Sequence, residues 1–405
     1  MHCVRKVTDD LYWVGANERR LALFENVHPL PEGVSYNAYL LMDEKTVLFD
    51  TVDWAVCRQF LENVEYVLDG RPLDYMIINH LEPDHAACID EILVRYPETI
   101  VISNEKAFMF MRQFGFNVDG RMEEVTEGDT RTFGKHTIAF AFAPMVHWPE
   151  AMVSFDVTNG VLFSADGFGS FGSLDGKLFD DEVNFDRDWI DSARRYLTNI
   201  VGKYGPHVAH LLNKATNVLK LDIKMLCPLH GPVWRTDLGY IIDKYVKWAT
   251  YTPEEKGILI IYASMYGNTE AAASALATRL VEKGITNVKM YDVSSTHVSY
   301  LIAETFKYSH VVLASVTYNL GIFPPIHNYL MGMKSLDMQK RTFAIMENGS
   351  WAPKAGDLIY EFLDNELKEM TVLDDRVSLN SSFSELNEPE MESLANALID
   401  SLNAE

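Results

Sequence analysis

The segment DYMIINHLEPDH, residues 74–85, decides the fold of the first half of the chain. Its apolar part predicts a buried strand, and a polar loop follows that strand directly. The loop contains four side chains of the kinds that bind metals, namely His80, Glu82, Asp84 and His85. An isolated pair of histidines at this spacing would equally fit a polar surface loop. The preceding strand instead favours a rigid loop whose side chains could surround two metal ions.

Three further residues of the same kinds stand at the ends of apolar runs. They are His147, Asp166 and His230, which follow the runs AFAPMV, VLFSA and KMLCPL. An ionisable side chain at the mouth of a buried strand is costly without a partner, and a metal supplies one. Each alone could be an ordinary polar residue, but their recurrence indicates a centre with four imidazoles and three carboxylates. Such a mixed set suits iron and dioxygen chemistry, whereas zinc hydrolases favour nitrogen-rich sites.

The other histidines have no such context. We interpret them as structural or exposed, including His136, His207, His210, His297 and His327.

The chain divides into two parts with different patterns. Up to about residue 250, short runs such as YNAYLLM, TVLFDTV and MVSFDV predict strands, and patterns such as AVCRQFLENVEYVL predict helices between them. From GILIIYAS onward, apolar strands alternate regularly with helices, which is typical of a doubly wound parallel sheet. We therefore expect an α/β protein with domains at residues 1–250 and 254–405.

Three loops leave the carboxyl ends of strands in the second domain, where ligands bind in open α/β sheets. The first combines hydroxyls and a glycine at a helix N-terminus, which suits a phosphate. The other two offer small hydrogen-bonding groups with two aromatic rings, which suits a flat flavin. No Gly-x-Gly-x-x-Gly fingerprint is present, so a dinucleotide is less favoured. The loop residues are Ser264, Met265, Tyr266, Gly267, Asn268 and Thr269; Ser315, Val316, Thr317, Tyr318, Asn319 and Gly321; and Asn348, Gly349, Ser350 and Trp351.

Composition excludes several classes of function. The formal net charge of −23 and the pI near 4.9 argue against nucleic acid as a partner. No segment approaches the roughly 20 apolar residues that span a bilayer, and the first residues do not resemble a secretion signal, so we expect a cytoplasmic protein. The cysteines form no C-x-x-C pair, which predicts neither a disulfide framework nor a thiolate metal site and fits a reducing compartment. They are Cys3, Cys57, Cys88 and Cys227.

The metal-type residues, in their order along the chain, resemble the metallo-β-lactamase superfamily, which implies an αββα sandwich for the first domain. Hydrolytic members usually carry a histidine where this chain has Glu82. The resemblance implies that His80, Glu82 and His147 hold one iron and that Asp166 bridges to a second. The second iron would be held by Asp84, His85 and His230. A bridging carboxylate is physically reasonable because it lowers the repulsion between two dications.

The three later loops resemble flavodoxin, with FMN as the ligand. A metallo-β-lactamase-like domain followed by a flavodoxin-like domain is similar to the flavo-diiron proteins, also called A-type flavoproteins. Members reduce dioxygen to water, nitric oxide to nitrous oxide, or both. In that family the flavin of one subunit serves the irons of another, so the resemblance implies a homodimer or a dimer of dimers. It also suggests that His28 and Tyr196 lie next to the metal ligands.

Two ferrous ions and one reduced FMN hold four electrons, which favours O2 as the substrate and an oxygen-detoxifying role. The sequence shows no cysteine pair up to Glu405, so we expect an external electron donor. The stretch NGSWAPKA, residues 348–355, resembles methanogen-type enzymes that take hydride from reduced deazaflavin coenzyme F420. Separate rubredoxin is the alternative donor, and a nitric oxide reductase fed by rubredoxin is the alternative function. A zinc hydrolase with a fused flavodoxin-like module is the rival from another class, and Glu82 speaks against it.

Overall fold

The computed structural model describes residues 1–218 and 221–404. The chain splits into two compact units. Unit 1 comprises Met1–Leu197 and Pro206–Val246, and unit 2 comprises Thr198–Gly205 and Lys247–Glu405. Among the described residues, no helix has the length and apolar character needed to cross a membrane.

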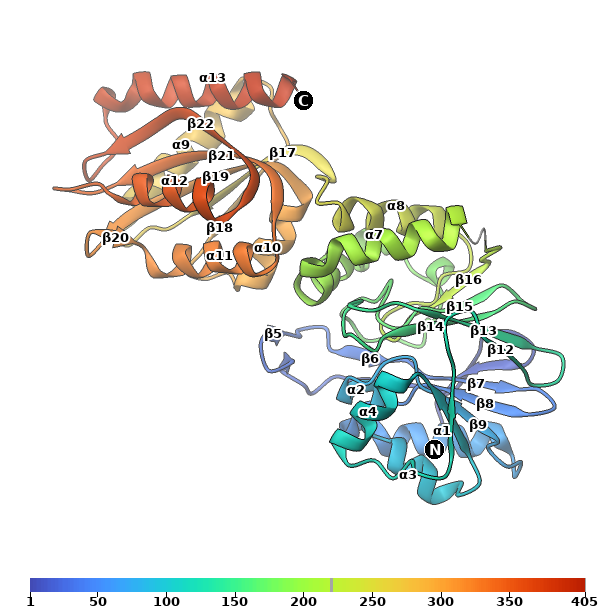
Figure 1. Ribbon diagram of the computed structural model, residues 1–405. Helices are drawn as coiled ribbons and strands as arrows, with labels where there is room; N and C mark the ends of the chain where they lie inside the picture. The colour runs from blue at the N-terminus through green and yellow to red at the C-terminus, as the bar shows by residue number, and fades with distance from the viewer. Residues whose placement is uncertain (219–220, 405) are drawn as a thin grey trace. The chain divides into compact units, whose positions relative to one another are not determined.

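Unit 1 is built on two β-sheets (Figure 1). The first has the order β1 (Arg5–Lys6), β2 (Leu11–Trp13), β7 (Tyr39–Met42), β8 (Thr46–Phe49), β9 (Tyr75–Ile77), β10 (Ile100–Ser103) and β11 (Met122–Glu124). The second has the order β12 (Thr130–Thr132), β13 (Thr137–Phe142), β14 (Met152–Asp156), β15 (Val161–Phe163) and β16 (Met225–Cys227). Residues from both sheets form one buried cluster, in which the rings of Phe49 and Phe163 stack with their centres 3.8 Å apart.

Helices cover the outer faces of the two sheets (Figure 1). On the first sheet lie α1 (Cys57–Leu68), α3 (Ile89–Arg95) and α4 (Glu105–Phe114); on the second lie α7 (Gly205–Asn213) and α8 (Leu238–Ala249). The helices α1, α4 and α8 are amphipathic, so each turns one apolar stripe toward its sheet. The expected αββα sandwich is confirmed.

The strand register brings the predicted metal residues to one edge of unit 1. Phe142 pairs with Met152, Ser154 with Phe163, and Phe163 with Cys227. The segments that follow β13, β15 and β16 therefore emerge together, and these segments carry the ligand-type residues of the second sheet. From the first sheet, β9 leads into the loop that we expected, but part of it is a short helix, α2 (Pro83–Ala86), with proline at its first position.

The structure corrects the expectation that the cysteines stay unpaired. Cys57 and Cys88 form a disulfide, with Cα atoms 6.1 Å apart and a sequence separation of 31. The two cysteines lie close together because the segment before α1 is hydrogen-bonded to α2. The backbone N–H and the hydroxyl of Thr51 both donate to the carbonyl of His85, at 2.9 and 2.7 Å. The spacing of the cysteines in the sequence does not predict that contact. Cys3 and Cys227 are free.

Unit 2 is a doubly wound sheet with the parallel order β18 (Val288–Asp292), β17 (Glu255–Tyr262), β19 (Tyr308–Tyr318), β21 (Gln339–Asn348) and β22 (Lys368–Leu379). A short strand, β20 (Gly321–Ile322), pairs antiparallel with β19. One face carries α9 (Asn268–Glu282) and α13 (Glu388–Ala404), and the other carries α10 (Val298–Lys307), α11 (Pro324–Ser335) and α12 (Ala355–Glu366) (Figure 1). The expected doubly wound topology is confirmed.

A buried histidine lies between two carboxylates in unit 1, outside the predicted metal residues. Nδ1 of His136 is 2.8 Å from Asp156 and Nε2 is 2.8 Å from Asp10. Burial lowers the pKa of His136, but the hydrogen bonds with Asp10 and Asp156 outweigh burial and raise the pKa above its ordinary value.

We expect His136→Asn to lower the free energy of unfolding by about 3 kcal/mol at pH 6, because two carboxylates lose a buried partner. The folded-state pKa lies above the unfolded value of about 6.5, so the contribution is complete below about pH 6.5 and is lost as the pH rises through the raised folded pKa. Urea unfolding of both proteins from pH 5.5 to 9 measures the difference, with the exposed His327→Asn as control. A difference that grew with pH would contradict this account.

Candidate metal and flavin sites

The seven predicted metal residues come together in unit 1 as two groups of buried side chains. His80, Glu82, His147 and Asp166 form one group, in which one ligand atom from each residue lies within 4.8 Å of all the others. The other group meets the same criterion and contains Asp84, His85 and His230. This division is the one that the family resemblance implies.

Asp166 lies between the two groups and turns one oxygen toward each. Its Oδ2 is 3.2 Å from Nε2 of His80 and 3.2 Å from Nε2 of His147. Its Oδ1 is 3.3 Å from Nε2 of His85 and 3.6 Å from Nε2 of His230. A carboxylate in this position can touch two cations at once.

The remaining carboxylates each belong to one group. Oε2 of Glu82 lies 2.9 Å from Nε2 of His147 and 3.4 Å from Nε2 of His80. Oδ2 of Asp84 lies 3.3 Å from Nε2 of both His85 and His230. Each prospective cation would thus meet two imidazoles and one carboxylate of its own, plus a share of Asp166.

Hydrogen bonds orient two of the imidazoles toward the cluster. Nδ1 of His80 is 2.9 Å from Oε1 of Glu150, and Nδ1 of His230 is 2.7 Å from the carbonyl of Ser35 in β6 (Val34–Tyr36). Because a carboxylate and a carbonyl can only accept here, each Nδ1 donates its proton and each Nε2 keeps its lone pair. This is the tautomer that binds a metal through Nε2.

Burial and the carboxylates shift the pKa values of several side chains in the two groups. Burial lowers the pKa of His147, but Asp166 and Glu82 outweigh it and raise that pKa to about 9. Burial likewise disfavours the charged form of His80, yet Asp166 holds its pKa well above the ordinary value. Burial raises the pKa of Asp84 to about 8. The buried carboxylates thus favour positive charge in their surroundings.

The residues fit a pair of metal ions. Both side-chain oxygens of Asp84 and of Asp166 are buried, and none of these oxygens has a hydrogen-bond partner among the described residues. A buried carboxylate without such partners is costly, and coordination to a cation would remove the cost. Three carboxylates with four imidazoles match the donors that iron accepts.

His28 and Tyr196 lie beside the two groups and outside them. The ring of Tyr196 is 5.2 Å from that of His230, and its hydroxyl is buried with no hydrogen-bond partner in the described structure. His28 opens β5 (His28–Pro29), and its Nε2 is 3.8 Å from Glu25 in the turn that follows β4 (Leu23–Phe24). Burial and the nearby Glu82 raise the pKa of Glu25 to about 8. The sequence analysis did not predict a role for Glu25, although it directly follows the short apolar run LALF.

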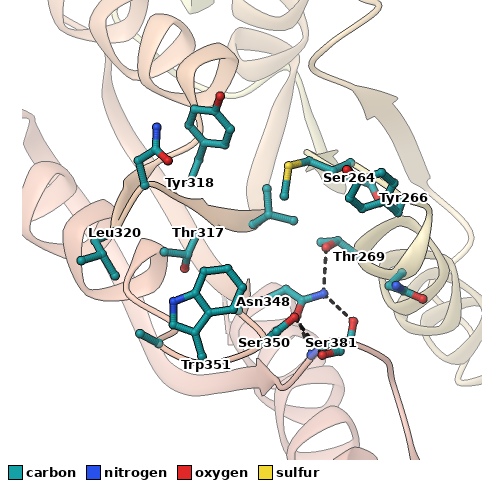
Figure 2. A pocket seen from close by; sticks show the side chains of 16 residues that line it. Ser264, Tyr266, Thr269, Thr317, Tyr318, Leu320, Asn348, Ser350, Trp351 and Ser381 are labelled. Carbon is teal, nitrogen blue, oxygen red and sulfur yellow. Dashed lines mark hydrogen bonds between the residues drawn. The ribbon is translucent and has the colours of Figure 1, made fainter.

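Unit 2 contains a cavity of about 320 Å³ at the carboxyl ends of β17, β19 and β21 (Figure 2). Most of the predicted loop residues line it: Ser264, Met265, Tyr266, Asn268, Thr269, Val316, Thr317, Tyr318, Asn319, Asn348, Gly349, Ser350 and Trp351. Gly267, Ser315 and Gly321 are not among the lining residues. Leu320 and Ala352, which lie within the predicted loops, line it as well, and so does Ser381, which the sequence did not indicate.

Asn348 joins three segments at the floor of the cavity (Figure 2). Its Nδ2 donates to Thr269 Oγ1 at 3.2 Å and to the carbonyl of Ser381 at 2.9 Å, and its Oδ1 accepts from the N–H of Ser381 at 3.1 Å. On another wall, Thr317 Oγ1 accepts from the backbone N–H groups of Lys354 and Ala355, at the start of α12. The loops are thus tied to one another before any ligand enters.

The rim of the cavity is apolar and exposed. Trp351 is 88% exposed and Tyr266 is 89% exposed. Leu320, Met265 and Tyr318 are exposed as well. A hydrogen-bonded floor beneath an aromatic rim is what a flavin needs, with its polar edge inside and its ring against the rim.

Comparison with known proteins matches both halves of the chain. The family described as ODP family beta lactamase matches residues 34–231, and the flavodoxin family matches residues 260–371. An uncharacterized protein from Methanocaldococcus jannaschii is 30% identical over 362 residues, which are 89% of this chain and 90% of that protein. The anaerobic nitric oxide reductase flavorubredoxin of Pectobacterium carotovorum is 31% identical over 357 residues, which are 87% of this chain and 70% of that protein.

Solved structures are similar over the whole chain. The rubredoxin oxygen:oxidoreductase of Desulfovibrio gigas superposes with a TM-score of 0.90 at 27% identity and 99% coverage of both chains. The flavodiiron protein of Giardia intestinalis has the same fold, with a TM-score of 0.90 at 23% identity, covering 99% of this chain and 98% of that one. The expected order of a metallo-β-lactamase-like fold and then a flavodoxin-like fold is confirmed. With both halves matched, and with relatives at 30% identity or more along most of its length, the chain belongs to the flavo-diiron protein family.

Proposed function

We propose that this protein reduces O2 to water at a non-heme di-iron site, with electrons relayed through FMN from reduced coenzyme F420, and so removes oxygen. The observation that carries the proposal is the position of Asp166, whose two oxygens divide between two groups of imidazoles and carboxylates. The rival zinc hydrolase is disfavoured by Glu82, which adds a carboxylate to the first group. The rubredoxin oxygen:oxidoreductase among the structural relatives supports O2 as the acceptor.

His80, Glu82 and His147 would hold one iron, and Asp84, His85 and His230 the other, with Asp166 shared. When bound, the two irons and a reduced FMN would supply the four electrons that O2 needs to become two waters. The reaction also consumes four protons. We assign the Tyr196 hydroxyl the role of hydrogen-bond donor to substrate, because it is buried beside His230 without a hydrogen-bond partner in the described structure. We assign His28 the role of passing protons inward, because its side chain is still 12% exposed.

We expect the purified protein to be yellow and to contain about one FMN and about two irons per chain, with little zinc, because the donors are carboxylate-rich. Metal analysis by mass spectrometry and flavin release at acid pH measure both. The expression medium should supply iron, zinc and riboflavin together, so that the metal content reflects the preference of the protein. Two zincs and no flavin under these conditions would favour the zinc hydrolase.

The assignment of F420 as donor rests on the edge of the flavin cavity. Trp351 lies there almost fully exposed, where a second flat ring could approach. Lys354 is exposed three residues further on, at the N-cap of α12, and its backbone is fixed by Thr317. An ammonium in that position would attract an anionic deazaflavin.

We expect reduced F420 to bleach the FMN rapidly without oxygen, and NADH to do so slowly or not at all. Lys354→Ala should weaken the affinity for reduced F420 about fivefold at low salt, which is about 1 kcal/mol, and less at high salt. Stopped-flow absorbance at the flavin band measures both effects. Lys256→Ala, at the opposite end of β17, is the matched control. If the FMN bleached only after rubredoxin was added, rubredoxin would replace reduced F420 as the proposed donor. The rest of the proposal would stand.

Nitric oxide is the second candidate substrate, because several relatives at 29 to 31% identity are anaerobic nitric oxide reductase flavorubredoxins. Single-turnover experiments with the reduced protein decide between the two. O2 consumption without nitrous oxide formation from NO supports the proposal, whereas turnover with NO alone would reverse it.

We also propose a head-to-tail dimer or a dimer of dimers. The family resemblance supports it, because in that family the flavin of one subunit serves the irons of another. Sedimentation velocity would measure the state, and a monomer would contradict this part of the proposal.

A further inference from the structure

Glu150 is a buried carboxylate that the metal groups do not include, although it contacts them. Its side chain is fully buried. Oε1 accepts a hydrogen bond from Nδ1 of His80 at 2.9 Å and another from the backbone N–H of Leu81 at 2.9 Å. Oε2 has no hydrogen-bond partner among the described residues. Glu150 is thus directed at His80.

The position of Glu150 in the chain ties it to a second ligand. It lies three residues after His147, in the segment between β13 and β14. Its carbonyl accepts from Nδ2 of Asn104 at 2.7 Å, and Oδ1 of the same Asn104 caps α4. A movement of Glu150 would therefore disturb His80 and His147 together, which are both imidazoles of the first group.

Among the described residues, the second group has no equivalent carboxylate. Nδ1 of His230 donates to the carbonyl of Ser35, which is neutral. Nδ1 of His85 is buried and has no hydrogen-bond partner in the described structure. A carboxylate behind a histidine makes the imidazole a stronger donor to a metal than a carbonyl does, because it stabilises positive charge on the ring. The two metal positions therefore differ in electron donation.

We propose that Glu150 is a positioning residue which fixes His80 in its metal-binding tautomer and makes the position of His80, Glu82 and His147 the more strongly binding and more electron-donating of the two. The metal at this position is held more tightly, and its oxidised state is favoured over that of its neighbour. The inference rests on the proposed metal pair, but not on the identity of the electron donor or of the substrate.

Two variants separate the geometry from the charge. Glu150→Gln keeps a carbonyl oxygen that can accept both hydrogen bonds, and it places an amide where Oε2 has no hydrogen-bond partner. Glu150→Ala removes both. The matched control is Asp156→Asn, because Asp156 is also buried and accepts from a histidine Nδ1 at 2.8 Å, at His136 outside the metal groups.

The test titrates the full-length, metal-free, FMN-loaded protein with Co²⁺ under anaerobic conditions and follows the visible bands of the ion. The wild type should bind two ions. Glu150→Ala should weaken one of the two about 10- to 100-fold, and Glu150→Gln should weaken the same one by about tenfold or less. Asp156→Asn should bind both as the wild type does.

Potentiometry of the iron-loaded proteins provides a readout that loss of structure alone would not give. Glu150→Gln should raise the reduction potential of the iron pair and leave that of the FMN unchanged. Cobalt affinities and iron potentials equal to those of the wild type in both Glu150 variants would overturn the inference. A wild type that binds no metal would overturn the proposed function as well, so the two failures are distinguishable.

Discussion

Asp166→Ala is expected to reduce O2 consumption about a thousandfold, the scale seen when a group that stabilises charge at a reacting centre is removed. FMN should stay bound and reducible in the variant. The reason is the position of Asp166, whose two oxygens face different groups, each lying between 3.2 and 3.6 Å from two imidazole nitrogens of its own group. In the proposed metal pair, the carboxylate would lower the repulsion between two dications held close together. Without it, we expect at least one metal to be lost.

Flavin chemistry serves as the internal control for this variant. The flavin cavity lies in unit 2 and Asp166 lies in unit 1, so the substitution should leave FMN binding intact. An oxygen electrode measures turnover, anaerobic titration measures the reducible flavin, and metal analysis counts the ions. Asp156→Asn removes another buried carboxylate of unit 1 and should retain turnover. If Asp166→Ala kept most of the oxidase activity, a bridging role for Asp166 would be excluded.

The metal groups could be predicted from the sequence because each member stands directly after an apolar run or in the loop behind one. A buried strand can be recognised in the sequence by its run of apolar residues. An ionisable residue at the end of such a run is unusual, because burying it without a partner is costly. The same logic indicated the loops after β17, β19 and β21, which line the cavity of unit 2. What the sequence could not give was the register that brings the ends of β13, β15 and β16 together.

Residues that contact the predicted metal ligands without belonging to either group were not predictable in this way. Glu150 follows no apolar run, and Glu25 follows the run LALF, of which only Leu23–Phe24 form a strand. Each contacts a predicted metal ligand only through the fold of its loop. Ser381 follows β22, an edge strand with few buried residues and a polar sequence, so no apolar run marked that strand. The pairing of Cys57 with Cys88 likewise depends on a tertiary contact between α2 and the segment before α1.

Glu82→His is expected to change which metal the protein selects, and with it to remove oxidase activity. The substitution would leave three imidazoles and the shared Asp166 in the first group, which is the nitrogen-rich arrangement that zinc favours. The loop should keep its shape, because the Glu82 side chain makes no capping hydrogen bond to α2 and Pro83 sets the first turn of that helix.

Zinc has no redox chemistry, so electrons could not pass from the flavin to O2 even in a fully loaded variant. We expect the Glu82→His protein, grown with iron and zinc together, to contain more zinc than iron, and its O2 consumption to fall about a hundredfold or more. Glu82→Gln is the control, since it removes the charge without adding an imidazole and should lower metal content without favouring zinc. The fall in O2 consumption should track the loss of iron across the two variants. An iron-filled Glu82→His protein that turned over at the wild-type rate would show that the carboxylate at this position does not decide between oxidase and hydrolase chemistry.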